Sequence, residues 1–216
     1  MTSIYMYAVS YDLGFAPNPF GGMCSLACCK PRIREHARIG DWIVGMTGTR
    51  LSPAMRCIYA MEVTDETTFD DYWVNPEYAS RKPIRNGTPM KQVGDNIYHR
   101  ASVQSPWQQE DSVHSLVDGS QSEPNTNHDT RINRVLFSTN YVYFGSLAEP
   151  LPQQVVTELE YERNPRDYYR FEAEKAPDLV AWLKAKVSAN PNRVLADPIN
   201  FSLSGRRFDP ERERMI

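Results

Sequence analysis

Alternation of apolar and polar residues predicts strands in the first third of the chain. The segment from Ile4 to Tyr11 alternates in this way, with tyrosines on one face. An apolar run from Trp42 to Met46 predicts a second strand and Arg56 to Val63 predicts a third, and we expect these two to pair antiparallel across the loop between them. A Thr before the acidic residues of TTFDDYW predicts a short capped helix.

The later part of the chain mixes both periodicities. Two β-rich runs around Ser138 to Asn140 predict a hairpin over Arg134 to Phe144. The pattern of Asp178 to Ala189 predicts an amphipathic helix, and a shorter helix is expected to begin at Pro152. We expect the charged tail from Pro198 onward to be loosely held.

These elements predict an α+β fold, a small mixed or antiparallel β-barrel with peripheral helices. We expect residues 1–150 to form the barrel domain and residues 151–216 to form a helical C-terminal extension packed on the same domain. The length of 216 residues suits one sizeable core.

Composition narrows the class of protein. Hydrophobic residues make up 41% of the chain and charged residues 24%, which is typical of a globular protein. The formal net charge of −3 argues against binding nucleic acid by bulk electrostatics. No run approaches the roughly 20 apolar residues that cross a bilayer, and the 4 cysteines do not form a disulfide framework, so we expect a cytoplasmic protein with no membrane partner.

The stretch from Phe15 to Gly48 concentrates residue types with special conformational or chemical properties. It contains a Pro-Asn-Pro turn, consecutive glycines at Gly21 and Gly22, and three of the cysteines. Glycines at a turn allow close approach of a ligand to the backbone. A basic cluster follows and favours either phosphate contact or a solvated face; its members are Lys30, Arg32, Arg34 and Arg38.

Four segments in one order carry a family resemblance: FAPNPFGGMCSLACCKPRIREHARIGDWIVG, YAMEVTDETTFDDYW, GDNIYHR and VLFSTNYVYFG. This order, over roughly residues 4–150, resembles the second nucleotide-modification-associated domain family, whose phage and bacterial proteins lie near DNA-base hypermodification systems. A weaker similarity, through GDWIVG and the strand after it, is to the PUA-like superfamily, which includes the EVE and YTH domains. Together they imply a pocket that recognises or makes a modified base. The resemblance carries over no catalytic residue.

The cysteines offer two kinds of chemistry. Cys24, Cys28 and Cys29 with His36 have the ligand types of a zinc site, but their spacing lacks paired C-x-x-C units, so buried free cysteines are favoured and no metal is predicted. Cys24, directly after the glycine turn, is a candidate nucleophile or a structural thiol. The glycine turn also lacks the Walker and dinucleotide fingerprints, and we predict no cofactor.

Aromatic and polar residues of the loops complete the predicted site. We predict Asp95 and His99 as catalytic residues, with His114 as an alternative general base. Trp107 and His114 lie in the polar excursion from Ser105 to Asp129, which is either functional or a partly ordered surface segment. The predicted ligand-binding residues are Phe15, Asn18, Phe20, Gly21, Gly22, Lys30, Arg32, Asn96, Tyr98 and Trp107.

Three functions remain open from the sequence. The first is recognition of a nucleotide or modified base, free or in DNA. The second is a nucleotide-modifying transferase or hydrolase that uses an Asp or His of the same pocket, and the third is a protein-interaction or inhibitor module. The sequence leaves the oligomeric state open.

Overall fold

A computed structural model describes residues 2–216, and its main layer is a seven-stranded mixed sheet. The sheet contains β1 (Ser3–Val9), β3 (Trp42–Thr47), β4 (Arg56–Glu62), β9 (Tyr141–Tyr143), β10 (Glu149–Pro150), β11 (Tyr169–Glu172) and β12 (Arg193–Val194). Its order is β11-β1-β3-β4-β9-β12, and β10 pairs with β4. The pairs β1–β3 and β9–β12 are parallel, and the others are antiparallel.

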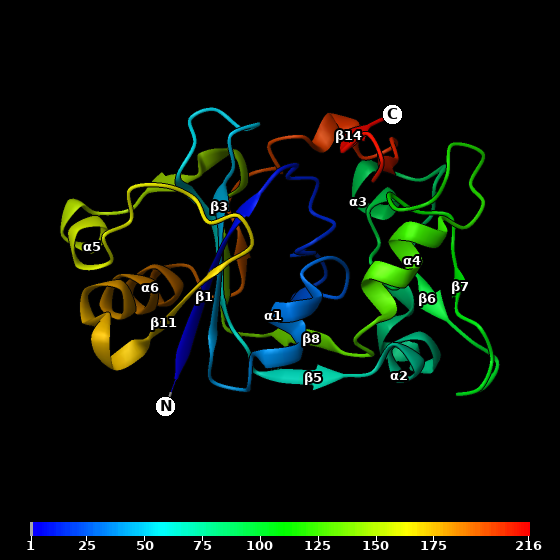
Figure 1. The fold of residues 1–216 in the computed structure, drawn as a ribbon, viewed down its shortest axis with the longest axis horizontal. Helices are drawn as coiled ribbons and strands as arrows, with labels where there is room; N and C mark the ends of the chain where they lie inside the picture. The colour runs from blue at the N-terminus through cyan, green and yellow to red at the C-terminus, as the bar shows by residue number, and fades with distance from the viewer. Residues whose placement is uncertain (1) are drawn as a thin grey trace.

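Two helices cover one face of this sheet, α5 (Gln153–Glu158) and α6 (Pro177–Ala189) (Figure 1). Leu179 and Leu183 of α6 pack in one apolar cluster with Ile4 and Met6 of β1. The intervening Tyr5 and its alternate neighbours belong to a second cluster on the opposite face. Alternation along β1 therefore supplies side chains to two cores.

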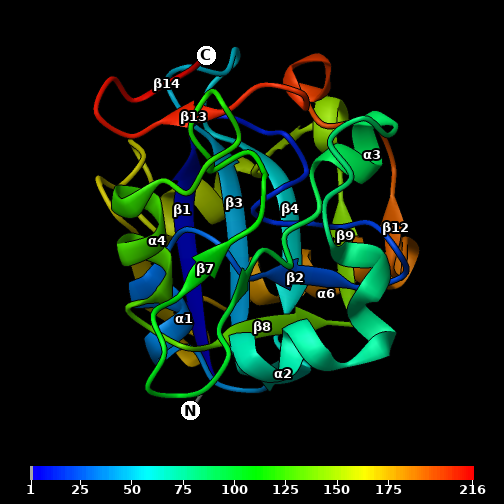
Figure 2. The same ribbon diagram turned by 90° about the vertical axis from the view of Figure 1, so that its right-hand side faces the viewer.

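The opposite face is covered by a three-stranded sheet, ordered β2-β8-β5, and by a short helix (Figures 1 and 2). These elements are β2 (Cys24–Leu26), β5 (Asp65–Thr67), β8 (Val135–Ser138) and α1 (Pro31–His36). A further group lies beyond them and comprises α2 (Phe69–Val74), the 3₁₀ helix Pro76–Arg81, α3 (Pro89–Gln92), β6 (Tyr98–His99), β7 (Gln108–Gln109) and α4 (Glu123–Thr130). Short 3₁₀ turns occur at Gly145–Leu147, Ala173–Lys175 and Phe201–Leu203.

The predicted N-terminal strands and their antiparallel partner are confirmed in β1, β3 and β4, and the helix over Asp178 to Ala189 is confirmed in α6. The predicted hairpin over Arg134 to Phe144 is wrong. Its two runs form β8 and β9, but β8 pairs with β2 and β5 while β9 pairs with β4. Every residue of both strands is buried, so each run is enclosed in its own layer and the turn between them passes from one sheet to the other.

The α+β class is confirmed, whereas the pairings among residues 2–216 leave the main sheet open, with β11 and β12 at its two ends. A closed PUA-like barrel therefore stays a prediction. The division at residue 150 also stays a prediction, since β11 and β12 lie beyond it yet extend the main sheet. Among the residues described, no helix is both long and apolar enough to cross a membrane.

The C-terminal tail is held more firmly than its charge suggested. It forms a hairpin of β13 (Phe208–Asp209) and β14 (Arg214–Met215). Phe208 N–H donates to the carbonyl of Val113 at 2.6 Å, and Arg207 pairs with Asp111 at 2.7 Å. Phe208 and Met215 add apolar contacts, so the expectation of a loosely held tail is corrected for this segment.

Candidate functional site

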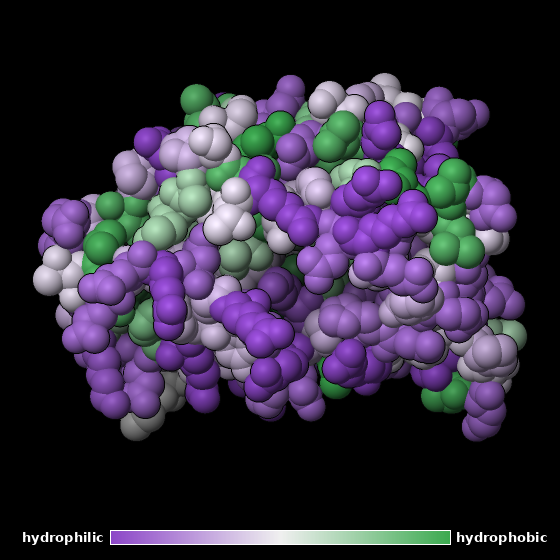
Figure 3. Space-filling model, turned by 45° about the horizontal axis from the view of Figure 1, so that its top comes forward, coloured by the Kyte–Doolittle hydropathy of each residue, from purple (hydrophilic) through white to green (hydrophobic). Residues whose placement is uncertain are grey.

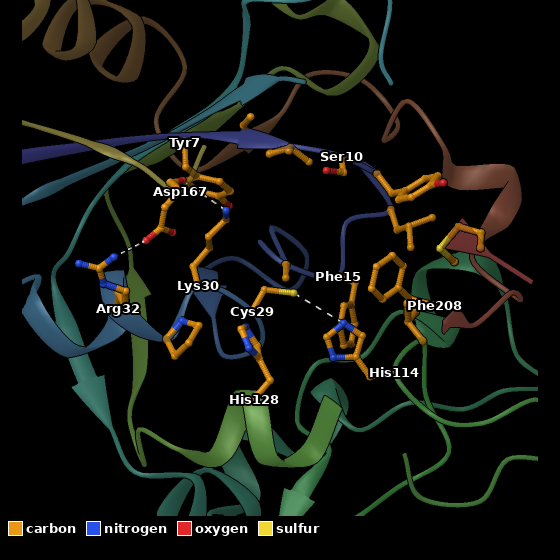
Figure 4. A pocket seen from close by; sticks show the side chains of 18 of the residues that line it. Tyr7, Ser10, Phe15, Cys29, Lys30, Arg32, His114, His128, Asp167 and Phe208 are labelled. Atoms are coloured by element: carbon orange, nitrogen blue, oxygen red, sulfur yellow. Dashed lines mark hydrogen bonds and ion pairs between the residues drawn. The ribbon is translucent and has the colours of Figure 1, made fainter. Parts of the chain in front are cut away.

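A cavity of about 370 Å³ lies between the end of β1, the start of α1, the α4 segment and the C-terminal hairpin. This volume is within the range of small-molecule sites. Figure 4 shows Cys29 in the cavity wall, with Lys30, Arg32 and Asp167 on one side and Phe15, His114 and Phe208 on the other. The cavity therefore combines a reactive thiol, a polar side and an aromatic side.

Cys29 is placed by an unusual backbone segment that follows β2. Both Cys29 and Lys30 adopt positive φ values, 60° and 40°, before Pro31 begins α1. Positive φ is uncommon for residues other than glycine, and such residues cluster at functional sites. The bend turns the Cys29 side chain, which is partly exposed, into the cavity.

His114 faces this thiol from the polar excursion. Its Nε2 lies 3.6 Å from Cys29 Sγ, and its Nδ1 lies 2.8 Å from Asp129 Oδ2. The His114 carbonyl accepts hydrogen bonds from the side chains of Gln109 and Asn125, and the ring meets Phe15 at a centroid distance of 4.8 Å. Packing against Phe15 and the hydrogen bonds to the His114 carbonyl thus keep the imidazole between the Cys29 sulfur and the Asp129 carboxylate.

Asp129, at the end of α4, completes the row of groups and is fully buried. One carboxylate oxygen accepts the Cys29 N–H at 2.7 Å, and the other accepts the Tyr98 hydroxyl at 2.8 Å as well as facing His114. Burial opposes ionisation of the carboxyl, but His114 and Arg34 lower the pKa of Asp129 below its ordinary value. Asp129 is therefore a carboxylate at neutral pH.

The charge state of His114 follows from the same neighbours. Burial alone lowers the pKa of an imidazole, but the Cys29 sulfur and the Asp129 carboxylate more than offset it and raise the pKa of His114 to about 10. The ring is therefore an imidazolium at neutral pH. A cysteine, an imidazole and an orienting carboxylate in hydrogen-bond contact have the arrangement of a nucleophilic triad.

Arg34 links the chain segment that carries Cys29 to the chain segment that carries Asp129. The guanidinium is buried and donates to the carbonyls of Cys29, Ile132, Arg134 and Asp129. These carbonyls belong to the segment before α1 and to the segment at the end of α4. One side chain thereby fixes Cys29 relative to Asp129.

The polar side of the cavity carries several charged groups. Arg32 forms an ion pair with Asp167 at 3.0 Å. Lys30 Nζ lies 3.4 Å from the Asp167 carbonyl and 4.8 Å from the centre of the Tyr7 ring, and burial lowers the pKa of its ammonium group. Arg131 and His128, from α4 and its end, also line the cavity.

Three of the predicted ligand-binding residues line the cavity, namely Phe15, Lys30 and Arg32. Tyr98 lies behind it and donates to Asp129. Asp95 is elsewhere and fully buried, where its carboxylate contacts Ser25, Tyr72 and Arg81. Among the residues that the structure describes, Asp95 is therefore not part of the cavity lining.

The other predicted site residues lie apart from this cavity. His99 pairs with Glu110 and stacks on Trp73, while Trp107 packs against Phe69. Their remaining members hold local structure or lie in the glycine turn: Asn18 donates to Val93 and accepts from Phe20, Phe20 stacks on Phe201, Asn96 donates to Tyr72, and Gly21 and Gly22 are exposed with positive φ.

Sequence reasoning named Cys29 only among possible zinc ligands, did not name Asp129 as a site residue, and named His114 only as an alternative base. The available signal was a cysteine two residues before Pro31, the first residue of a helix. As a sign of a nucleophilic cysteine this was weaker than the glycine turn before Cys24. Cys24, however, is fully buried, and burial raises the pKa of its thiol. The partners of Cys29 are 85 and 100 residues away, a separation that no local pattern reveals.

A metal is a second use for part of this cluster. Donor atoms of Cys28, His114 and Asp129 lie within 4.8 Å of one another, and all three residues are buried. His36, the ligand considered from sequence, instead contacts the Arg32 carbonyl through Nδ1. The His114 nitrogen and Asp129 oxygen are already in hydrogen-bond contact, and a metal between them has to separate this pair. The geometry therefore fits a triad better than a metal site.

Comparison with known proteins identifies the family but no individual relative. The family model described as nucleotide modification associated domain 2 matches residues 1–205 of the 216-residue chain. This match covers the triad and almost the whole fold. No curated protein and no solved structure matches the chain significantly.

Proposed function

The chain belongs to the nucleotide modification associated domain 2 family, and we propose that it is an enzyme that modifies a nucleotide or its base through a covalent intermediate on Cys29. The observation that carries the proposal is the contact chain from Cys29 through His114 to Asp129, which opens on a cavity. A structural thiol has no need of an oriented imidazole, and a binding pocket has no need of a nucleophile.

The proposed chemistry is group transfer or hydrolysis at an electrophilic carbon. In the reactive form His114 is already an imidazolium beside the Cys29 thiolate, and the sulfur attacks the carbon to form a C–S bond. His114 then donates its Nε2 proton to the leaving group as the bond to that group breaks. Asp129 keeps the ring oriented through Nδ1, and water or a second substrate releases the product by the reverse proton transfer.

Recognition without catalysis is the second candidate, and the aromatic side of the cavity favours it. Phe15 and Phe208 on this side, and Tyr7 beside Lys30, offer ring faces and edges against which a base can pack. The interaction-module reading has less support, since polar residues cover most of the face in Figure 3 and apolar residues are scattered over it. A setting in DNA-base modification of phages or bacteria, and PUA-like ancestry, are parts of the proposal that rest on resemblance.

A turnover screen distinguishes the proposed enzyme from a protein that recognises a base without catalysis, here called the reader. Purified protein is incubated with free nucleotides and short DNA, with and without candidate group donors, and both product and intact protein mass are followed by mass spectrometry. We expect a product, or an adduct on Cys29, that is lost in Cys29→Ala. Cys24→Ala is the matched control and should retain both. Binding with no product or adduct in any mixture would support the reader instead.

Metal analysis of the same preparation tests the alternative use of the cluster. The proposal predicts that Cys29→Ala abolishes reactivity in protein containing no stoichiometric metal. A bound metal that is lost in Cys28→Ala, with reactivity lost alongside it, would contradict the triad and favour a metal site.

A further inference from the structure

We propose that Lys30 and Arg131 bind the phosphate of a free nucleotide, so that the substrate is a nucleoside phosphate and not a base within a DNA strand. This inference deepens the proposed function and rests on it for the identity of the ligand as a nucleotide. It starts from the distribution of charge around the cavity.

The first argument is that the cavity contains cations that the protein itself does not pair. Of the charged groups in its lining, Arg32 and Asp167 neutralise each other at 3.0 Å. Within residues 2–216, no carboxylate oxygen lies within 4 Å of the charged nitrogens of Lys30 or Arg131. The Asp167 carboxylate acts on Lys30 only from beyond ion-pair distance. Two cations that line a concave site with no ion pair of their own favour an anionic ligand.

Lys30 is the stronger candidate of the two for contact with phosphate. It is only partly exposed, and its ammonium group has a carbonyl and the Tyr7 ring as neighbours. A carbonyl oxygen and an aromatic ring each attract a cation more weakly than an anion does. Burial lowers the pKa of Lys30, and an anion in the cavity would raise it again by stabilising the ammonium group.

Arg131 lines the same cavity and directly follows α4, the helix that carries the triad carboxylate. Its guanidinium has His128 Nδ1 as a side-chain neighbour at 3.4 Å. Arg131 is exposed, so its guanidinium can turn toward a ligand without disturbing the core. A planar guanidinium suits bidentate contact with phosphate.

The opposite side of the cavity fits the rest of a nucleotide. Phe15 and Phe208 line it beside His114, with ring centroids 4.8 and 6.2 Å from the imidazole. With phosphate at Lys30 and the base near these rings, the intervening atoms pass Cys29, as the arrangement in Figure 4 illustrates. A ligand in this position brings an electrophilic carbon of the base or of its attached group to the thiol.

Cavity size and protein charge favour a single nucleotide over a strand. A volume of about 370 Å³ suits one small ligand, and the C-terminal hairpin contributes Phe208 and Met215 to its lining. Binding a strand draws on a continuous basic track, whereas the formal net charge here is −3. The unpaired cations of this cavity are few and local.

The test measures equilibrium binding in a Cys29→Ala background, so that it does not depend on turnover. The probes are the four deoxynucleoside 5′-monophosphates, the matching nucleosides, inorganic phosphate and a 12-mer single strand. We expect at least one monophosphate to bind about tenfold or more tightly than its nucleoside. Lys30→Met and Arg131→Met should each remove most of this difference and leave nucleoside affinity within about twofold.

Arg38→Met is the matched control, since Arg38 belongs to the same basic run but lies outside the cavity lining and contacts the carbonyls of Glu35 and Ala37. It should keep the preference for the monophosphate, and unfolding curves of all three variants confirm folding. Equal affinity for nucleotide and nucleoside, no binding of any probe, or no effect of Lys30→Met and Arg131→Met would overturn the inference. Tighter binding of the 12-mer than of every monophosphate would overturn the choice of a free nucleotide.

These outcomes are distinguishable from failure of the proposed function. Phosphate-dependent binding with no turnover in the wild-type protein would retain the anion site and contradict the enzyme. Cys29-dependent turnover of an uncharged nucleoside would retain the enzyme and contradict the anion site.

Discussion

Two fully buried aspartates, Asp95 and Asp129, occupy similar surroundings and differ in one respect. Each accepts a tyrosine hydroxyl at 2.8 Å, from Tyr72 and Tyr98 respectively. Each also has a buried arginine nearby that donates to backbone carbonyls, Arg81 beside Asp95 and Arg34 beside Asp129. The difference is that Asp129 contacts His114, which in turn contacts a cavity-lining thiol, whereas the Asp95 cluster ends in Ser25.

The pKa shifts of the two carboxyl groups run in opposite directions for this reason. Burial is the main cause at Asp95 and raises its pKa. Burial acts the same way at Asp129, but the adjacent imidazolium and Arg34 reverse the result and lower the pKa. A buried aspartate alone is thus no sign of catalysis; its link to a titratable group that reaches a cavity is the informative feature.

The largest difference is expected when each carboxylate becomes an amide. Asp129→Asn should reduce turnover by about 100-fold or more, because the amide no longer stabilises the imidazolium. Asp95→Asn should lower the free energy of unfolding by about 1–3 kcal/mol through lost hydrogen bonds and leave turnover of the folded protein nearly unchanged. Steady-state kinetics and urea unfolding of both variants check this, and equal turnover losses would remove the distinction.

Arg34 and Arg81 stabilise the two clusters in the same way, by donating hydrogen bonds to buried carbonyls. Arg34→Met and Arg81→Met should each reduce the free energy of unfolding by about 3 kcal/mol or more, since several buried carbonyls lose their donor. Arg32→Met is the contrast, because its ion pair with Asp167 is exposed and should contribute less than about 1 kcal/mol. Chemical denaturation measures all three, and a small loss for Arg34→Met would contradict its fastening role.

The tyrosines sharpen the comparison further. Tyr72→Phe and Tyr98→Phe each remove one hydroxyl donor from a buried carboxylate and should cost about 1–2 kcal/mol of stability. Only Tyr98→Phe should also alter turnover, by several-fold, because Tyr98 supports the triad carboxylate. An equal kinetic effect of Tyr72→Phe would indicate that the Asp95 cluster also takes part.

The last prediction is a dependence of stability on pH. The pKa of His114 is raised from 6.5 to about 10 in the folded protein, so its imidazolium stabilises the fold fully below about pH 6.5. This contribution is lost as the pH rises through about 10. Relative to His114→Gln, the wild-type protein should therefore lose its added stability between these values in thermal unfolding. A constant difference across this range would contradict the raised pKa.

Much of the fold follows from local patterns, but the site does not. The alternation of β1 and the helical period of α6 appear in the sequence because each element buries one face against a definite layer. The hairpin prediction failed because β8 and β9 are buried on all sides, which removes the pattern that distinguishes partners. Pairing between layers is a tertiary property.

The sequence predicted part of the site, namely Phe15, Lys30 and Arg32 of the cavity lining and, as an alternative general base, His114. Asp95 and His99 attracted attention as polar residues in a turn, yet the first is enclosed and the second pairs with Glu110. Cys29 obtains its partners from α4 and the loop before it, a contact made by folding and fixed by Arg34. The spacing of these residues along the chain does not indicate that they are in contact.

The central claim is that His114 activates Cys29, and the rate of thiol alkylation tests it without a known substrate. Native protein is treated with iodoacetamide at pH 7, and modification of each of the four cysteines is followed by peptide mass spectrometry. We predict that Cys29 reacts first and that His114→Asn slows it by about tenfold or more, with Asp95→Asn leaving its rate unchanged. If Cys29 reacts no faster than the three buried cysteines, or reacts equally fast without His114, the triad is not a catalytic device.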